Sequence, residues 1–195
     1  MFEDLPRTRF AAIYADPPWA FDTYGSQANS TTDVNRHYET MALEDIKAMP
    51  VSELAAPDCV LFLWVTWPTL ERAIDVINAW DFTYKTCAFA WMKANGKQID
   101  LFHEDVKADM TTGYWTRSNS EVCLLATVGK PHRVNADVRQ GIIEPRRQHS
   151  RKPSCVYDRI ERLVAGPYLE LFARTARPGW TSWGNQVGKF AETTS

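Results

Sequence analysis

Short apolar segments that end at polar residues or prolines constrain the fold of this chain more than any other feature. Residues 10–15 are apolar and are followed by Asp16 and two prolines, which is typical of a buried parallel strand that ends at the edge of a sheet. Residues 59–65 repeat this pattern, and after Pro68 the apolar residues fall at helical spacing, at positions 70, 73, 74 and 77. We therefore expect two buried strands, with a crossover helix after the second.

The remaining apolar segments continue this alternation. Further strands are expected at residues 86–91, 122–127, 168–172 and 180–183. Between them, Pro153 begins a helix that ends before Gly166-Pro167 and has an inward face of Val156, Ile160, Leu163 and Val164. Strands that alternate with helices favour a doubly wound α/β sheet covered on both faces. The length of 195 residues and the 45% hydrophobic content favour a single domain over residues 1–195.

Two long polar stretches interrupt the pattern, at about residues 22–38 and 95–119. Both are longer than a structural connection requires, so we expect them to be functional loops. The first follows the strand at residues 10–15 directly and contains Tyr24, Arg36, His37 and Tyr38, which are suited to contacting a base.

The spacing of the cysteines and the composition of the first residues argue against a metal or redox site and against a secreted protein. Four cysteines lie about thirty residues apart, without the close pairs of a zinc or redox site, so we expect reduced thiols and no metal. Residues 1–7 contain acids and a proline where a signal peptide needs a basic start and an apolar run. No later segment approaches the length of a membrane span. We expect a protein of the cytosol or nucleoid without a membrane partner.

Asp16-Pro17-Pro18-Trp19 is the candidate catalytic motif. A carboxylate at a strand end can accept one N–H bond from an exocyclic amine such as the 6-amino group of adenine, and the carbonyl of Pro17 can accept the other. The two prolines restrict the backbone and cannot donate, so they form a rigid mount for acceptors. Trp19 would offer a face for a base extruded from a duplex. The alternative is a strand-ending turn with a buried tryptophan.

Several further motifs follow in a fixed order along the chain. They are Leu61-Phe62-Leu63-Trp64-Val65-Thr66, Gly113-Tyr114-Trp115, His149-Ser150-Arg151-Lys152-Pro153, Glu170-Leu171-Phe172-Ala173-Arg174, Gly179-Trp180 and Trp183-Gly184-Asn185-Gln186. Together with the Asp-Pro-Pro-Trp motif, they resemble the DPPW-type adenine-N6 methyltransferase family. That family includes the catalytic subunit of the messenger-RNA adenosine methyltransferase and many phage and bacterial DNA-modifying members. The likeness covers roughly residues 10–189.

The resemblance implies a methyltransferase that uses S-adenosylmethionine, with a Rossmann-like fold and a circularly permuted motif order. It implies that Asp16 and Pro17 hold the target amine. It also implies cofactor binding by Asp16, Lys152, Glu170, Phe172, Ala173, Arg174, Asn185 and Gln186. The chain lacks the usual G-x-G turn, and Phe172 ends a strand where that turn would be.

A nucleic-acid substrate must be held locally, because the formal net charge of the chain is -2. Residues 130–152 contain seven Lys or Arg and only two acidic residues, which indicates a phosphate-binding segment. We expect substrate contacts from Tyr24, Arg36, His37, Tyr38, Trp115, Arg117, Arg146 and Arg147. The compact chain without an RNA-binding module favours DNA over RNA, and a homodimer or a partner subunit stays open.

Three alternatives remain at this point. The first is methylation of RNA, which differs in the recognition of a 2′-hydroxyl or a single-stranded shape. The second is a catalytically inactive partner subunit, which should lack the acid or the second proline of the motif, whereas this chain has both. The third is methylation of a protein amide, where an Asn usually replaces the residue at position 16.

Overall fold

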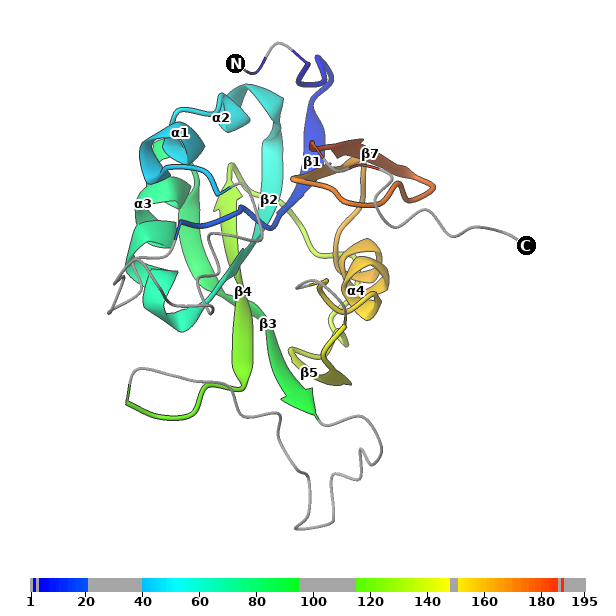
Figure 1. The fold of residues 1–195 in the computed structure, drawn as a ribbon. Coiled ribbons are helices and arrows are strands. Elements are labelled where there is room, and N and C mark those ends of the chain that lie inside the picture. The colour runs from blue at the N-terminus through cyan, green and yellow to red at the C-terminus, as the bar shows by residue number, and fades with distance from the viewer. Residues whose placement is uncertain are drawn as a thin grey trace, which may run out of the picture.

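A computed structural model of the chain describes residues 2, 4–20, 40–94, 115–147, 151–185 and 187. Within these residues a seven-stranded sheet is flanked by helices (Figure 1). In chain order the elements are β1 (Phe10–Ala15), α1 (Leu43–Lys47), α2 (Val51–Leu54), β2 (Ala55–Val65), the 3-10 helix η2 (Trp67–Thr69), α3 (Leu70–Ala79), β3 (Thr83–Ala94), β4 (Ser120–Val128), β5 (Gly141–Pro145), α4 (Cys155–Leu163), β6 (Tyr168–Leu171) and β7 (Trp180–Trp183).

The strands are arranged in the order β5-β3-β4-β2-β1-β6-β7. β1 lies in the middle and pairs in parallel with both β2 and β6. β4 runs antiparallel to its two neighbours, β2 and β3, which are therefore parallel to each other. α3 connects β2 to β3, so the expected crossover helix is confirmed. The predicted α/β class is also confirmed, with a mixed sheet.

Each face of the sheet carries its own hydrophobic core. Ile13, Leu61 and Leu63 pack on the face covered by α1, α2 and α3. The alternating residues Tyr14 and Trp64 pack on the opposite face, which is covered by α4. Figure 1 shows these helices on the two sides of the sheet. Successive residues of a strand point to opposite faces. A side chain at the end of a strand therefore lies on the same face as the residue two positions away from it.

Each predicted strand and helix corresponds to a described element. The largest differences in length are found for two inner strands of the sheet, β2 and β3. β2 and β3 are longer than the expected strands 59–65 and 86–91. Strand β6 ends one residue early, because Phe172 has a φ of 62° and leaves the extended conformation. Of the four expected inward residues, Val156, Ile160 and Val164 are buried and Leu163 is partly buried; Val164 follows the last residue of α4. Three short elements were not expected from the sequence: α1, α2 and β5.

The four cysteines are free thiols, as predicted. Cys59 and Cys123 are buried, and Cys87 and Cys155 are partly buried. Burial raises the pKa of Cys59 to about 12 and that of Cys155 to about 11, so both are protonated at neutral pH. Across the ranges that the structure describes, no helix is both long and apolar enough to cross a bilayer.

Candidate active site at the carboxyl edge of the sheet

One edge of the sheet collects the polar residues that the fold leaves at the ends of its strands. The carboxyl ends of β1, β2 and β6 meet there, because Ala15 is in register with Leu63 and Leu171. β4 begins at the same edge, since Val122 pairs with Val65 at the end of β2. In parallel α/β sheets, ligands bind outside the carboxyl ends of the strands. This edge is therefore the place to look for a site.

The charged side chains at this edge point to the face of the sheet that α4 covers, because each lies two positions from a residue that packs on that face. Asp16 follows Tyr14 by two positions, Glu170 follows Tyr168 by two, Lys93 follows Trp91 by two, and Glu121 precedes Cys123 by two. The aromatic and thiol members of these pairs belong to the core under α4 or pack against it. The alternation of each strand thus brings four charged groups from four strands toward one side.

Four side chains form a continuous series of ion pairs, which we call the ion chain: Lys93, Glu121, Lys152 and Asp16. Lys152 Nζ lies 2.9 Å from Asp16 Oδ1 and 3.0 Å from Glu121 Oε2. Lys93 Nζ lies 2.5 Å from Glu121 Oε1. Lys152 and Glu121 each expose 10% of their side chains, and Asp16 exposes 22%. The positive and negative groups alternate, so each buried charge has a partner of opposite sign.

The surroundings shift the pKa values within the ion chain. Burial raises the pKa of Asp16 above its ordinary value, and the ammonium of Lys152 opposes that effect. Burial also acts to raise the pKa of Glu121, but Lys152 and Lys93 outweigh it, and the pKa is lowered. For Lys152, burial acts to lower the pKa, and the two carboxylates reverse the direction. Lys152 is therefore held as a cation between two acids.

The Asp-Pro-Pro-Trp segment is fixed by backbone hydrogen bonds. The N–H of Trp19 donates to the carbonyl of Pro17 at 2.9 Å, and the N–H of Met41 donates to the carbonyl of Pro18 at 2.9 Å. The carbonyl of Pro17 retains a second lone pair for a further donor. These contacts fix the backbone of the segment that follows Asp16 at the end of β1.

Trp19 differs from its expected role. Its side chain is only 6% exposed and belongs to the hydrophobic core. Its indole Nε1 donates to the carbonyl of Trp64 at 3.1 Å, which ties the motif to β2. The expected stacking face is therefore not presented to a ligand, because burial of the ring against the core satisfies both its apolar surface and its N–H. Trp19 anchors the motif.

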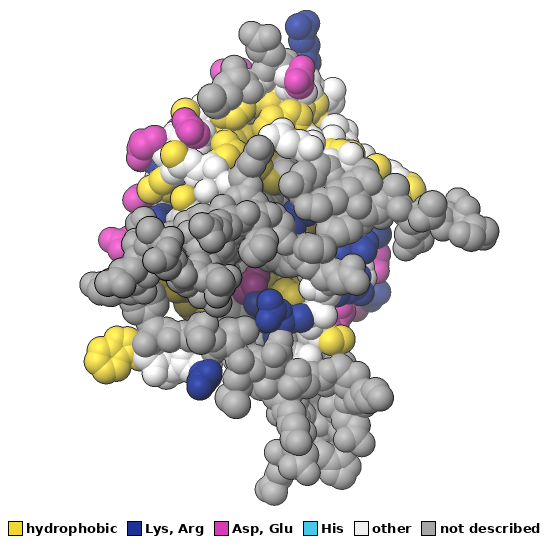
Figure 2. Space-filling view, viewed as in Figure 1, with side chains coloured by type: hydrophobic (Ala, Val, Ile, Leu, Met, Phe, Trp, Pro, Cys, Tyr) yellow, Lys and Arg dark blue, Asp and Glu magenta, His cyan; other side chains and the backbone are white. Residues whose placement is uncertain are grey.

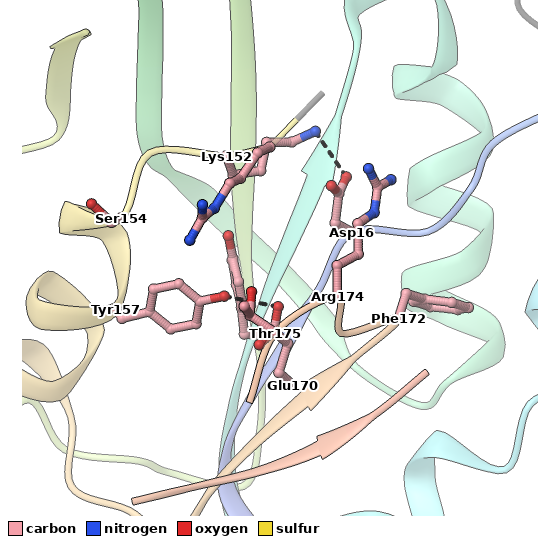
Figure 3. A pocket seen from close by; sticks show the side chains of 10 residues that line it. Asp16, Lys152, Ser154, Tyr157, Glu170, Phe172, Arg174 and Thr175 are labelled. Atoms are coloured by element: carbon pink, nitrogen blue, oxygen red, sulfur yellow. Dashed lines mark hydrogen bonds and ion pairs between the residues drawn. The ribbon is translucent and has the colours of Figure 1, made fainter. Parts of the chain in front are cut away.

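A pocket opens next to the ion chain, between β1, β6 and the segment before α4 (Figure 3). It is lined by Tyr14, Asp16, Arg151, Lys152, Ser154, Tyr157, Glu170, Phe172, Arg174 and Thr175. In Figure 3, Arg174 extends toward Asp16, while the ring of Phe172 points away from Tyr157. The lining of the pocket thus contains both cations and carboxylates.

Glu170 is a buried acid of the pocket with a raised pKa. Tyr157 Oη donates to Glu170 Oε1 at 2.9 Å, whereas Glu170 Oε2 is buried without a hydrogen-bond partner. Burial raises the pKa of Glu170 to about 7, against the hydrogen bond from Tyr157 and with a contribution from the charge of Asp16. A buried polar atom without a partner is uncommon in folded proteins and calls for a ligand or an ordered water.

A tight turn after β6 carries the next group of predicted cofactor residues. Phe172 takes a positive φ of 62°, and the N–H of Ala173 donates to the carbonyl of Trp183 at 2.9 Å. Gly184 packs against this turn so closely that a Cβ there would lie 2.6 Å from the backbone of Ala173. Asn185 follows as an exposed residue. Of the predicted cofactor residues, the pocket brings together Asp16, Lys152, Glu170, Phe172 and Arg174.

The predicted substrate-binding residues are only partly within the described chain. Tyr24, Arg36, His37 and Tyr38 lie outside the described residues, as do Gln186 and most of the stretch 95–119. Trp115 is 98% exposed, and Arg117 and Arg146 are exposed. Arg147 is exposed, and its Nη2 donates to Ser154 Oγ of the pocket at 3.1 Å. Figure 2 shows basic side chains beside an acidic one near the middle of the viewed face.

Several residues of the site were not expected from the sequence. They include Lys93 and Glu121 of the ion chain and Tyr157, which contacts Glu170 in the pocket. Lys93 and Glu121 lie just beyond the expected strands 86–91 and 122–127, where a charged residue next to an apolar segment marks a sheet edge. The sequence thus marked both residues as lying at an edge of the sheet. To place them at the same edge, however, one has to know that β4 runs antiparallel to its neighbours. Tyr157 lies one position after the inward-facing Val156 of α4, and the sequence carries no signal for its contact with Glu170.

The geometry defines an α/β enzyme fold with a polar ligand pocket at the carboxyl ends of two adjacent parallel strands. The chain belongs to the MT-A70 family, whose model matches residues 10–186.

Three relatives illustrate the range of similarity. The chain is 32% identical to the Type II methyltransferase M.MunI of Mycoplasma sp, over 96% of this chain and 82% of that protein. It is 30% identical to the N(6)-adenosine-methyltransferase catalytic subunit METTL3 of Homo sapiens, over 92% of this chain and 28% of that protein. It is 31% identical to an MT-A70-like N(6)-adenosine-methyltransferase of Arabidopsis thaliana, over 91% of this chain and 24% of that protein. The chain thus spans about a quarter of the length of these two adenosine methyltransferases.

Proposed function

We propose that this protein transfers a methyl group from S-adenosylmethionine to the 6-amino group of adenine in DNA. The observation that carries the proposal is the Asp16 carboxylate, which lies at the end of β1, faces a polar pocket and is paired through Oδ1 with Lys152. A carboxylate held in this way can accept an N–H of the amine and orient its nitrogen.

The residues of the motif divide the work of holding the amine. Asp16 accepts one N–H, and the ammonium of Lys152 favours the ionised form of that carboxylate and fixes its orientation. The carbonyl of Pro17, which already accepts the N–H of Trp19, has a second lone pair for the other N–H. Two acceptors on a rigid backbone place the lone pair of the nitrogen toward the pocket, and positioning of this kind is a large part of catalysis.

Polar groups in the pocket, and on β7 beside it, fit a nucleoside cofactor. Glu170 Oε2 and Ser182 Oγ are buried without hydrogen-bond partners, and the two residues are paired across β6 and β7. Polar groups of a bound ligand would satisfy such atoms. Arg174 lines the same pocket, and its guanidinium is the cation that we assign to the methionine carboxylate. Asn185, at the adjacent turn, would meet ribose hydroxyls or an adenine edge. When bound, the cofactor supplies a sulfonium methyl group as the electrophile.

We further propose that the sheet is a circularly permuted, doubly wound methyltransferase fold in a single domain. The order of the strands supports this assignment, since β1, with the catalytic motif, precedes β6, with the cofactor residues, and the two strands are direct neighbours. Helices on both faces of the sheet are also consistent with it. Such a domain would act in the cytosol or nucleoid, on DNA.

DNA is favoured over RNA by the extent of the similarities. The chain aligns with 82% of the Type II methyltransferase M.MunI, a far larger share than of METTL3, and it has the compact size that favours DNA over RNA. RNA adenosine is the second candidate, because 92% of this chain aligns with METTL3. Since the chain spans 28% of METTL3, the activity of that whole protein does not transfer to this chain directly.

The test is to incubate the purified protein with methyl-labelled S-adenosylmethionine and duplex DNA, single-stranded DNA or RNA. Labelled nucleosides are then identified by mass spectrometry. We expect N6-methyladenine from DNA, and a loss of at least ~100-fold in the rate for Asp16→Asn, which keeps the shape of the side chain but weakens its ability to accept an N–H. The matched control is Asp75→Asn, an exposed carboxylate on α3, and it is expected to retain wild-type activity.

Three outcomes would contradict parts of the proposal. Label in RNA alone would assign the substrate to RNA. Label in no adenine would reject the function. An active Asp16→Asn variant would reject the role of the carboxylate while leaving the substrate assignment in place.

A further inference from the structure

We propose that Lys93 is a positioning residue that controls the carboxylate of Asp16 through Glu121 and Lys152. The inference rests on the proposed function, because it assigns Asp16 to the target amine. Lys93 lies near the end of β3 and Asp16 follows β1, with β4 and β2 between those strands in the sheet. An effect of Lys93 on Asp16 must therefore be transmitted across two strands.

The side chains between them form a continuous path. Lys93 pairs with Glu121 Oε1 at 2.5 Å, and Lys152 Nζ pairs with Glu121 Oε2 at 3.0 Å. Strands two positions apart in a sheet are separated by about 9.6 Å, so Glu121 on β4 and Asp16 after β1 need a bridging group. Lys152 supplies it, since its Nζ lies 5.5 Å from the ring centroid of Trp64 on the intervening β2 and 2.9 Å from Asp16 Oδ1.

Lys152 is shared between two acids, so a group that weakens its pairing with one acid strengthens its pairing with the other. Lys93 is such a group. Glu121 competes with Asp16 for the ammonium of Lys152. Lys93 satisfies the other oxygen of Glu121 and so reduces the pull of Glu121 on Lys152. The four groups of the ion chain also balance in charge, with two cations and two anions. Removal of the charge of Lys93 or of Glu121 therefore changes the potential at Asp16, and the sign of the change depends on which of the two charges is lost.

Other groups near Asp16 do not remove this dependence. The charged and titratable groups that face it or line its pocket are Tyr14, Glu121, Cys123, Arg151, Lys152, Tyr157, Glu170 and Arg174. Burial raises the pKa of Tyr14 and that of Cys123 well above their ordinary values, so both stay neutral while Asp16 titrates. The pKa of Glu170 is about 7, and its effect is common to all variants compared below.

The test measures the pKa of Asp16 directly, by NMR titration of protein labelled with ¹³C at the Asp carboxyls, with Asp16→Asn used to assign the resonance. Lys93→Met is expected to raise the pKa of Asp16 by about 1 unit, because Glu121 then draws Lys152 away and one negative charge is left unbalanced. Glu121→Gln is expected to lower it by a similar amount, because Lys152 is left to Asp16 alone. The double variant restores the charge balance and is expected to return close to the wild-type value.

Two further variants separate a positioning role from a structural one. Lys93→Arg keeps the charge and is expected to preserve the wild-type pKa of Asp16. Lys47→Met removes a lysine from an ion pair with Glu44 on α1, on the other face of the sheet, and is expected to leave the pKa unchanged. Loss of stability alone would affect both single variants in the same direction, whereas the proposal requires shifts of opposite sign.

The outcomes distinguish this inference from the proposed function. Absent or same-sign pKa shifts in Lys93→Met and Glu121→Gln overturn the role of Lys93, whatever the enzyme methylates. Opposite shifts support it without any substrate present. The acid limb of kcat/KM on duplex DNA is then expected to move with the measured pKa of Asp16. A limb that stays fixed while the pKa moves would reject Asp16 as the group that holds the amine.

Discussion

At the level of single residues, the ionisation of Glu170 is expected to make folding stability depend on pH near neutrality. Its pKa in the folded protein is about 7, against an ordinary value of 4.5. Between these two values the folded state holds a proton that the unfolded state has released, so folding stability falls as pH rises through this window. The shift corresponds to roughly 3 kcal/mol at most, at 1.36 kcal/mol per pKa unit. Glu170→Gln mimics the protonated acid and should remove this pH dependence.

Urea unfolding at a series of pH values from about 4.5 to 8 checks this prediction. The free energy of unfolding of the wild type, relative to Glu170→Gln, is expected to decrease as the pH rises. Glu71→Gln, which changes an exposed carboxyl on α3, is the control and is expected to follow the wild-type curve. A wild type and Glu170→Gln with parallel curves would show that Glu170 ionises as easily as an exposed acid.

The candidate site could be predicted in part from single residues. Asp16 and Lys152 were expected at the site, and the structure pairs them directly. Glu121 and Lys93 were not expected, because their place beside Lys152 depends on β4 running antiparallel to both of its neighbours. Trp19 was expected to face a ligand, but a single tryptophan after a strand carries no signal that separates a stacking face from a core anchor.

At the level of secondary-structure elements, the contact between the end of β7 and the turn after β6 shapes one wall of the pocket. A Cβ at Gly184 would lie 2.6 Å from both the N and the O of Ala173. Backbone atoms cannot move aside as a flexible side chain can, so Gly184→Ala must shift the turn that carries Phe172 and Arg174. We expect a loss of about 1–3 kcal/mol in stability, as for other overpacked sites.

The chain offers a matched control for this variant. Gly141 begins β5, and a Cβ there would meet no atom within 4 Å. Gly141→Ala is therefore expected to change the free energy of unfolding by less than about 0.5 kcal/mol. Urea unfolding of both variants, together with calorimetric titration of S-adenosylmethionine, provides the comparison. Equal stability of the two variants would mean that the turn adjusts without cost.

Some strands of the sheet could be predicted from the sequence, and others could not. The strands at residues 10–15 and 180–183 coincide with β1 and β7, because unbroken apolar segments bounded by polar or turn residues are a local signal. The direction of β4 was not predictable, because it is set by pairing with β2 and β3. β5 was missed because its five residues lie within the basic segment 130–152, which was interpreted from its charge as a phosphate-binding segment and not from its few apolar residues.

At the level of the whole molecule, the proposed function requires the chain to bind a polyanion, although its formal net charge is -2. We attribute binding to the basic segment 130–152, in which Arg147 contacts Ser154 at the pocket. Each phosphate contact releases counterions, so the logarithm of the binding constant falls with the logarithm of the salt concentration with a slope of about -0.9 per contact. Arg146→Ala combined with Arg147→Ala should reduce the magnitude of that slope by about 2.

The control for this prediction removes the same charge from the opposite edge of the sheet. Arg7 and Arg9 are exposed and precede β1, whereas the pocket lies beyond its carboxyl end. Fluorescence anisotropy with a labelled duplex, at salt concentrations from about 50 to 200 mM, is expected to give Arg7→Ala with Arg9→Ala the wild-type slope. If both double variants lower the slope equally, the protein binds DNA through its overall field. A difference between them locates the phosphate contacts at the edge that carries Asp16.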